Sequence, residues 1–178
     1  NTIECMKRIG NIYDRISSIE NVRNAAIEAM RHKTLTRQMK SFASDFDRNC
    51  IELAQNLQSF NLPACRYAVK IVREPKERHI LIAPFYFRVI HQAIVLQLKN
   101  VWNKSLINST YACIPNRGIH KAFSDVQSVM KSSKLPLYAM KLDVRKYFDN
   151  VDHDVLKSII RQKIKCTKYS FLPMQRKG

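Results

Sequence analysis

The sequence predicts an α+β protein that is predominantly helical, with one β-hairpin and one further short strand. Apolar residues recur every three or four positions over several long stretches, which is the spacing of amphipathic helices. The spacing changes to alternation over residues 67–82 and again over residues 137–144, which is typical of strands. The chain has only 3 glycines in 178 residues and contains neither GxGxxG nor GxxxxGK[ST]. This composition argues against a Rossmann domain, a P-loop domain and a glycine-rich barrel.

Helices are predicted for most of residues 1–60, which we interpret as an N-terminal helical extension. Residues 12–30 have apolar side chains at helical spacing and form one helix or two, and residues 31–40 follow as a basic connector. Residues 41–60 are predicted to form a single amphipathic helix that ends before Pro63. Its apolar positions are Phe42, Phe46, Cys50, Leu53, Leu57 and Phe60. Residues 1–5 precede Met6, a candidate start of the natural chain.

A β-hairpin with a charged tip is predicted next. The residues that alternate with polar neighbours are Tyr67, Val69, Ile71, Ile80 and Ile82. Between these two runs lies the sequence REPKER, residues 73–78, whose proline and charges are typical of a turn.

The second half of the chain is predicted to contain three helices and one strand. Residues 85–102 have a wide apolar face, which predicts a deeply packed helix, and residues 119–130 form another. Residues 137–144 read as a short strand, and Asp152 or a neighbour caps a last helix that extends to Ile164. Residues 166–178 show no periodicity and are predicted to be an irregular or truncated end.

The charge of the chain points to a polyanionic partner. Its 31 Lys and Arg exceed its 14 Asp and Glu, for a net charge of +17. Such a domain binds phosphates and gains free energy from the counterions it releases, so nucleic acid is favoured over a membrane surface. No stretch approaches the ~20 apolar residues that a membrane span needs. The 5 cysteines form no CxxC pair, which predicts reduced thiols in the cytoplasm.

Asp143 is the leading candidate for metal chemistry. It ends the predicted strand at residues 137–144, where a carboxylate contributes little to packing and could bind Mg²⁺ together with substrate phosphates. From the residues alone, Asp143 is equally well explained as a Mg²⁺ ligand and as a residue of a turn that follows the strand. For Asp149, Asp152 and Asp154, turn and helix-capping roles are favoured over metal binding.

Two basic groups are candidates for phosphate binding. Arg73, Lys76 and Arg78 at the hairpin tip could clamp a triphosphate or a nucleic-acid backbone, although Glu74 and Glu77 make a solvated turn the simpler interpretation. The second group, beside the predicted start of a helix, consists of Arg117, Gly118, His120 and Lys121. Backbone amides at a helix N-terminus suit a phosphate. Nearby Cys113 is predicted to be a small buried hydrophobic residue rather than a nucleophile.

Three blocks, in this order, resemble the N-terminal half of bacterial reverse transcriptases of the group II intron, retron and diversity-generating retroelement types. REPKERHI (73–80) followed by PFYFRVIHQA (84–93) resembles the fingers hairpin and the helix after it. YACIPNRGIHKA (111–122) resembles a second block, and LDVRKYFDNVDH (142–153) resembles the first palm motif. Two positions depart from the common pattern: Ile114 stands where many relatives have Arg, and Phe87 where many have Asp.

The resemblance implies a right-hand polymerase with fingers at residues 61–136 and a partial palm at residues 137–165. It assigns Asp143 and the Val144 carbonyl to Mg²⁺, and Lys76, Arg78 and Phe148 to the incoming deoxynucleoside triphosphate. Phe148 would exclude a ribose 2′-hydroxyl. The residues implied to contact RNA template or primer are Arg73, Arg88, Arg117, Gly118, His120 and Lys121. A retroelement accessory protein is a further implied partner.

One motif of the family is missing. The chain contains no Tyr-x-Asp-Asp turn and no Asp-Asp pair at all, so we expect it to be inactive as a polymerase by itself. Two other interpretations remain open at this stage. The chain could be a non-catalytic basic RNA-binding domain, or part of a DNA-dependent polymerase or primase with a similar palm.

Overall fold

The computed structural model describes residues 8–73 and 75–165, and these combine helices with small sheets. The expectations for residues 1–5 and 166–178 lie outside these ranges. The described residues fall into two compact units, one formed by residues up to 99 together with 160–165 and the other by residues 100–159. The predicted α+β class is confirmed at this level, and the predicted division at residues 60, 136 and 165 stays a prediction.

The first unit opens with two short helices, α1 (Ile12–Ile16) and α2 (Ile19–Met30). The chain turns between them because the side chain of Ser18 accepts a hydrogen bond from the Asn21 amide at 3.3 Å and caps α2. Of the two predicted alternatives for residues 12–30, the structure therefore has two helices.

Helices α3 (Arg37–Ser44) and α4 (Phe46–Gln58) replace the single helix predicted for residues 41–60. That prediction was wrong because the backbone leaves the helical region at Asp45, and the Asn49 side chain donates from its NH₂ group to the Phe42 carbonyl at 2.9 Å across the break. The Phe42 ring packs edge-on against Phe46 and Phe85. The apolar spacing continues through the break because both helices bury side chains in the same core.

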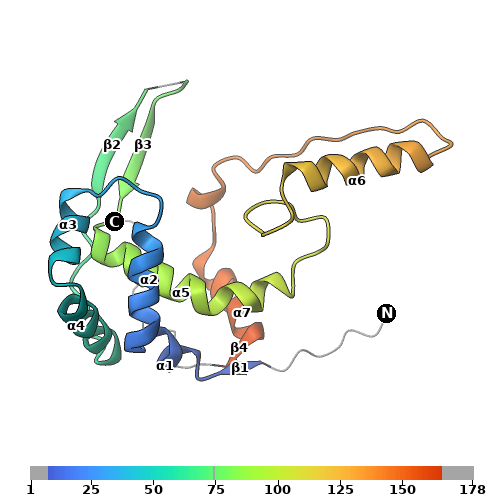
Figure 1. The fold of residues 1–178 in the computed structure, drawn as a ribbon. Helices are drawn as coiled ribbons and strands as arrows, with labels where there is room; N and C mark the ends of the chain where they lie inside the picture. The colour runs from blue at the N-terminus through green and yellow to red at the C-terminus, as the bar shows by residue number, and fades with distance from the viewer. Residues whose placement is uncertain (1–7, 74, 166–178) are drawn as a thin grey trace. The chain divides into compact units, whose positions relative to one another are not determined.

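The core of this unit lies between α2, α4 and α5 (Phe85–Asn103) (Figure 1). Val22, Leu53 and Val89 are fully buried, which confirms the deep packing predicted for residues 85–102. The buried side chain of Asn21 is paired, as the low dielectric of a core favours. The Asn21 side chain donates to the Ala93 carbonyl at 3.1 Å and accepts from Gln97 at 2.6 Å.

The predicted hairpin is confirmed as β2 (Ala68–Val72) paired antiparallel with β3 (Arg78–Ile82). Its register places Val72 opposite Arg78 and Ala68 opposite Ile82. The hairpin projects from the helices of its unit, and its side chains are largely exposed on both faces (Figure 1). A second, parallel pair joins β1 (Ile9–Gly10) to β4 (Ile164–Lys165). Ile164, predicted to end a helix, lies instead in β4, where its side chain is buried.

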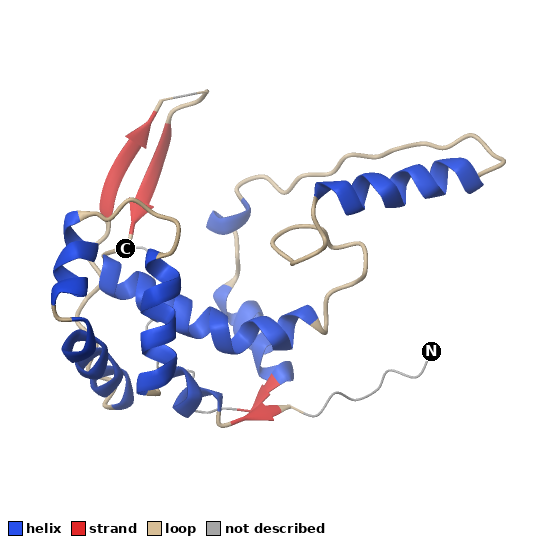
Figure 2. Ribbon diagram, in the orientation of Figure 1, coloured by secondary structure: helices blue, strands red, loops and turns tan. Residues whose placement is uncertain are grey.

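The second unit contains α6 (Ile119–Ser132), the 3₁₀ turn η1 (Tyr147–Asp149) and most of α7 (His153–Lys163). Helix α6 is confirmed, but its apolar side chains are exposed, including Phe123 at 68 %. The strand predicted for residues 137–144 is not formed, and Figure 2 shows this segment as loop. A strand needs a neighbouring backbone to satisfy its amides and carbonyls, and no described segment pairs with this one.

Candidate nucleic-acid interface

The hairpin tip presents two basic side chains that no described carboxylate pairs with. Arg73 Nε lies 4.0 Å from Glu77, and His79 Nε2 lies 3.5 Å from the same carboxylate. Lys76 and Arg78 form no ion pair with any described residue. Because opposed residues of an antiparallel pair share a face, Lys70, Val72 and Arg78 lie on one side of the hairpin. This side presents cations on an exposed arm of the first unit.

Arg88 lies in the second turn of α5 and is half-buried. Its guanidinium carbon is 5.5 Å from the centre of the Phe85 ring, a cation–π contact that holds the side chain in place. The Phe85 amide in turn donates to the Gln38 side chain of α3 at 2.9 Å. The first residue of α5 is thus hydrogen-bonded to α3, and the positive charge of Arg88 lies beside this contact.

The basic group at the start of α6 is partly paired inside the second unit. Lys121 forms an ion pair with Asp125, and the Tyr111 hydroxyl donates to the same carboxylate at 2.8 Å. The hydrogen bond from Lys121, and then that from Tyr111, lowers the pKa of Asp125, while the bond to Asp125 raises the pKa of Tyr111. Lys121 is therefore committed to a local contact.

The rest of this group remains exposed or semi-exposed. Arg117 donates to the Ile107 carbonyl at 3.2 Å, and His120 is exposed. Gly118 caps α6, and a Cβ there would meet open space, so no close packing requires a glycine. Cys113 is exposed rather than buried as predicted, because it lies in a surface turn with a positive φ of 58°.

Asp143 and Val144 lie on the exposed loop that precedes η1. Phe148 follows within η1 and is 88 % exposed, touching the Tyr147 ring edge-on at 5.3 Å between centroids. The turn is held by Asn150, whose side chain donates to the Arg145 carbonyl at 3.1 Å. The ring of Phe148 is thus presented on the surface rather than packed in a core.

Asp152 has the capping role predicted for it. Its carboxylate accepts hydrogen bonds from the amides of Asp154 at 2.8 Å and Val155 at 3.1 Å. These bonds satisfy donors in the first turn of α7 that have no partner within the helix. Asp154 forms an ion pair with Lys157 at 3.0 Å, so both carboxylates have structural partners.

The described residues do not provide a magnesium site by themselves. No group of three or more His, Cys, Asp or Glu side chains gathers in residues 8–73 or 75–165. Mg²⁺ is bound with near-octahedral oxygen geometry, which one exposed carboxylate does not supply. The assignment of Asp143 and Val144 to Mg²⁺ therefore has no geometric support from the other described residues.

The candidate residues divide between the two units. Arg73, Lys76, Arg78 and Arg88 belong to the first unit, and the candidates from Arg117 to Phe148 belong to the second. Sequence reasoning missed Asp125, although its position four residues after Lys121 is the spacing of a helical ion pair. It also missed Gln38, and no local signal could have found that contact because its partner is 47 residues away.

No protein-family model matches this sequence, and no curated protein matches it at a significant level. None of the helices in the described part of the chain has the length and apolar character needed to cross a membrane.

Proposed function

We propose that this chain is the fingers and the beginning of the palm of an RNA-directed DNA polymerase, and that it binds RNA and deoxynucleoside triphosphate. The observation that carries the proposal is the order of the three sequence blocks, with the first falling on an exposed hairpin whose Lys76 and Arg78 form no ion pair with a described residue. A hairpin that carries free cations suits the phosphates of a nucleotide or of a template.

In the reaction proposed for the complete enzyme, the primer 3′-hydroxyl oxygen forms a bond to the α-phosphorus of a deoxynucleoside triphosphate. The bond from that phosphorus to the oxygen that bridges it to the β-phosphate breaks, pyrophosphate leaves, and the proton of the hydroxyl passes to water. Lys76 and Arg78 would hold the negative charge of the triphosphate, and such positioning is the main protein contribution to phosphoryl transfer. The exposed ring of Phe148 would meet the sugar and reject a 2′-hydroxyl.

The assignment of Asp143 to magnesium belongs to this proposal and rests on the resemblance alone. Further carboxylates would have to come from a segment that contains the family's Tyr-x-Asp-Asp turn. The 178-residue chain has no such turn, so we expect no template-directed synthesis from it.

A non-catalytic RNA-binding domain is the second candidate function. Two observations favour it for the chain as it stands: the net charge of +17 and the capping role of Asp152. In this case RNA would bind, whereas deoxynucleoside triphosphate would have no site of its own.

Nucleotide-dependent thermal stabilisation separates the two candidates. We expect dTTP to raise the melting temperature of the chain more than UTP does, and Lys76→Gln/Arg78→Gln to remove the effect of both. The matched control is Arg15→Gln, an exposed cation of α1 away from the hairpin. Stabilisation by RNA with no response to either nucleotide would instead favour the RNA-binding domain.

A further inference from the structure

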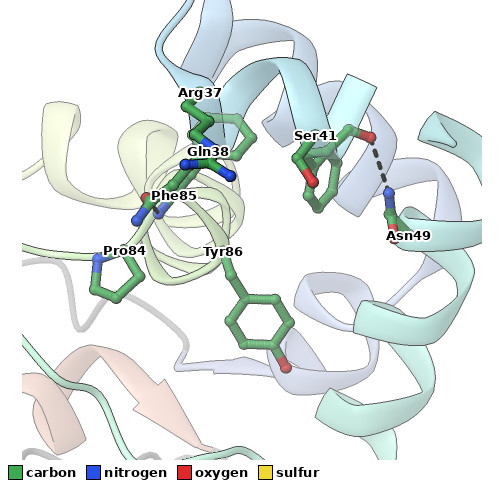
Figure 3. A pocket seen from close by; sticks show the side chains of 8 residues that line it. Arg37, Gln38, Ser41, Asn49, Pro84, Phe85 and Tyr86 are labelled. Carbon is green, nitrogen blue, oxygen red and sulfur yellow. Dashed lines mark hydrogen bonds between the residues drawn. The ribbon is translucent and has the colours of Figure 1, made fainter. Parts of the chain in front are cut away.

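The first unit has a cavity between α3, α4 and the beginning of α5, separate from the hairpin tip (Figure 3). Its volume is about 380 Å³. Sites for small organic groups are typically of ~300–1,000 Å³. Helix α3 contributes Arg37, Gln38 and Ser41, and α4 contributes Asn49. The opposite wall is formed by residues 84–86.

The walls combine apolar surface with two unused hydrogen-bonding groups. Phe42 and Phe85 form an edge-to-face pair with centroids 5.2 Å apart, and both line the cavity. Gln38 uses its side-chain oxygen to accept from the Phe85 amide at 2.9 Å, which leaves its NH₂ group without a partner among the described residues. Asn49 uses its NH₂ group to donate to the Phe42 carbonyl, and its side-chain oxygen accepts no hydrogen bond from a described residue.

The segment that forms one wall of the cavity is basic. Between Glu28 and Asp45 the chain has no acidic residue, and the Lys and Arg in this interval are Arg31, Lys33, Arg37 and Lys40. Arg37 lines the cavity itself. The carboxylates at the beginning of α4 are already paired, Asp45 with Arg48 at 3.7 Å and Asp47 with Arg23 at 2.8 Å. No lining residue is acidic, and Glu52 of α4 is the carboxylate whose charge acts on the lining hydroxyl of Tyr86.

We propose that this cavity takes one unpaired base of a single-stranded nucleic acid, with an adjacent phosphate on Arg37. A flat heteroaromatic ring suits apolar walls, and its edge can pair with the free donor of Gln38 and the free acceptor of Asn49. A base within a duplex cannot enter, because its edge is paired and its faces are stacked. The inference deepens the proposed nucleic-acid function and adds a site that the hairpin does not supply.

The test uses a single-stranded oligouridine with one central 2-aminopurine, whose fluorescence reports the environment of that base. We expect the 178-residue chain to change this fluorescence on binding, and a complementary duplex of the same length to give no such change. Ser41→Phe should fill the cavity and weaken the fluorescence-detected affinity about fivefold to a hundredfold, the range for loss of a base contact. Ala43→Phe adds the same ring to the same helix outside the cavity, and should leave the affinity unchanged.

Two arginine variants provide a second test, which does not depend on whether Ser41→Phe folds. Arg37→Gln should weaken binding several-fold more than Arg15→Gln, which removes the same charge from α1. Equal effects of Ser41→Phe and Ala43→Phe, or of the two arginine variants, would overturn the cavity site.

The hairpin variant separates the two proposals. Lys76→Gln/Arg78→Gln should lower the overall affinity, measured by anisotropy, and keep the fluorescence change at saturation. If that variant weakens binding and the cavity variants do not, the cavity site is wrong and the proposed function stands. If the wild-type chain binds no nucleic acid at 50 mM salt, both proposals are wrong. A fluorescence change that a duplex reproduces equally would also contradict the cavity site.

Discussion

Phe148 is the residue at which exposure decides between two roles. A core aromatic would be buried, whereas this ring is 88 % exposed on η1. An exposed ring is free to contact a ligand. It does not pack in the core of the described structure. Asp143 is likewise exposed, on the loop that precedes η1.

The first prediction concerns the stability of Phe148→Ala. Because surface truncations stay within ~0.5 kcal/mol, the free energy of unfolding should hardly change. Phe85→Ala serves as the contrast, since that ring is only 2 % exposed and its loss should cost about 3–5 kcal/mol. Thermal denaturation followed by circular dichroism measures both. Equal destabilisation by the two variants would mean that Phe148 packs in a core.

The second prediction concerns the protonation of Asp125. Its pKa is lowered from the ordinary 3.8, first by the hydrogen bond from Lys121 and then by that from Tyr111. Because the pKa is lowered in the folded state, ionised Asp125 stabilises the fold at pH values above its ordinary pKa. This stabilisation is lost as the pH falls through the lowered pKa. Carbon-detected NMR titration should therefore give a value below 3.8 for wild type.

Two variants check the causes of that shift. Lys121→Gln should raise the Asp125 pKa more than Tyr111→Phe does, because the lysine bond is the larger cause. Lys131→Gln, at the other end of α6, should leave it unchanged. An Asp125 that titrates normally in all four proteins would show that the three side chains do not interact in solution.

At the scale of elements, caps and breaks decide where helices begin and end. Ser18 starts α2 and Thr36 starts α3, each by accepting a backbone amide of the first turn. The sequence at the break between α3 and α4 contains no proline or glycine that would predict it. The non-helical backbone at Asp45 and the hydrogen bond from the Asn49 side chain to the Phe42 carbonyl mark it.

The third prediction concerns the cap of α7. Asp152→Ala should speed hydrogen exchange of the Asp154 and Val155 amides, because it removes their acceptor at a typical cost of about 1 kcal/mol. Asp152→Asn keeps a good capping oxygen and should exchange nearly as wild type. If Asp152→Asn were as disruptive as Asp152→Ala, the negative charge would be essential and a role beyond capping would follow.

At the scale of the whole molecule, excess positive charge is spread over many elements, so phosphate contacts should dominate binding. The fourth prediction is that affinity for single-stranded RNA falls steeply with salt, with a log–log slope of about −0.7 per phosphate contacted. Fluorescence anisotropy between 50 and 300 mM salt measures it. Base composition should matter little to this slope, and an affinity independent of salt would contradict the interface described above.

Sequence patterns were sufficient for most elements of the first unit. Helical spacing located α2 and α5 and the apolar face of α4, but not the break before α4, and alternation located β2 and β3, since these periods follow from which face is buried locally. The same rule was misleading at residues 137–144, where the apolar alternation is present and no neighbouring strand is described. Alternation of apolar and polar residues indicates that a segment suits a sheet with one buried face. The backbone hydrogen bonds of a sheet form only if a second strand lies beside it.

By itself, the sequence determined the basic charge, the order of the three blocks and the chemical character of Asp143, Phe148, Lys76 and Arg78. The tertiary structure alone decided which of these charges are free. Lys121 is paired with Asp125 and Arg73 lies beside Glu77, while Lys76 and Arg78 form no ion pair within residues 8–73 and 75–165. It also created the cavity beside Arg37, whose walls come from segments almost fifty residues apart. Local periodicity cannot encode such contacts, because they depend on how helices pack rather than on where helices occur.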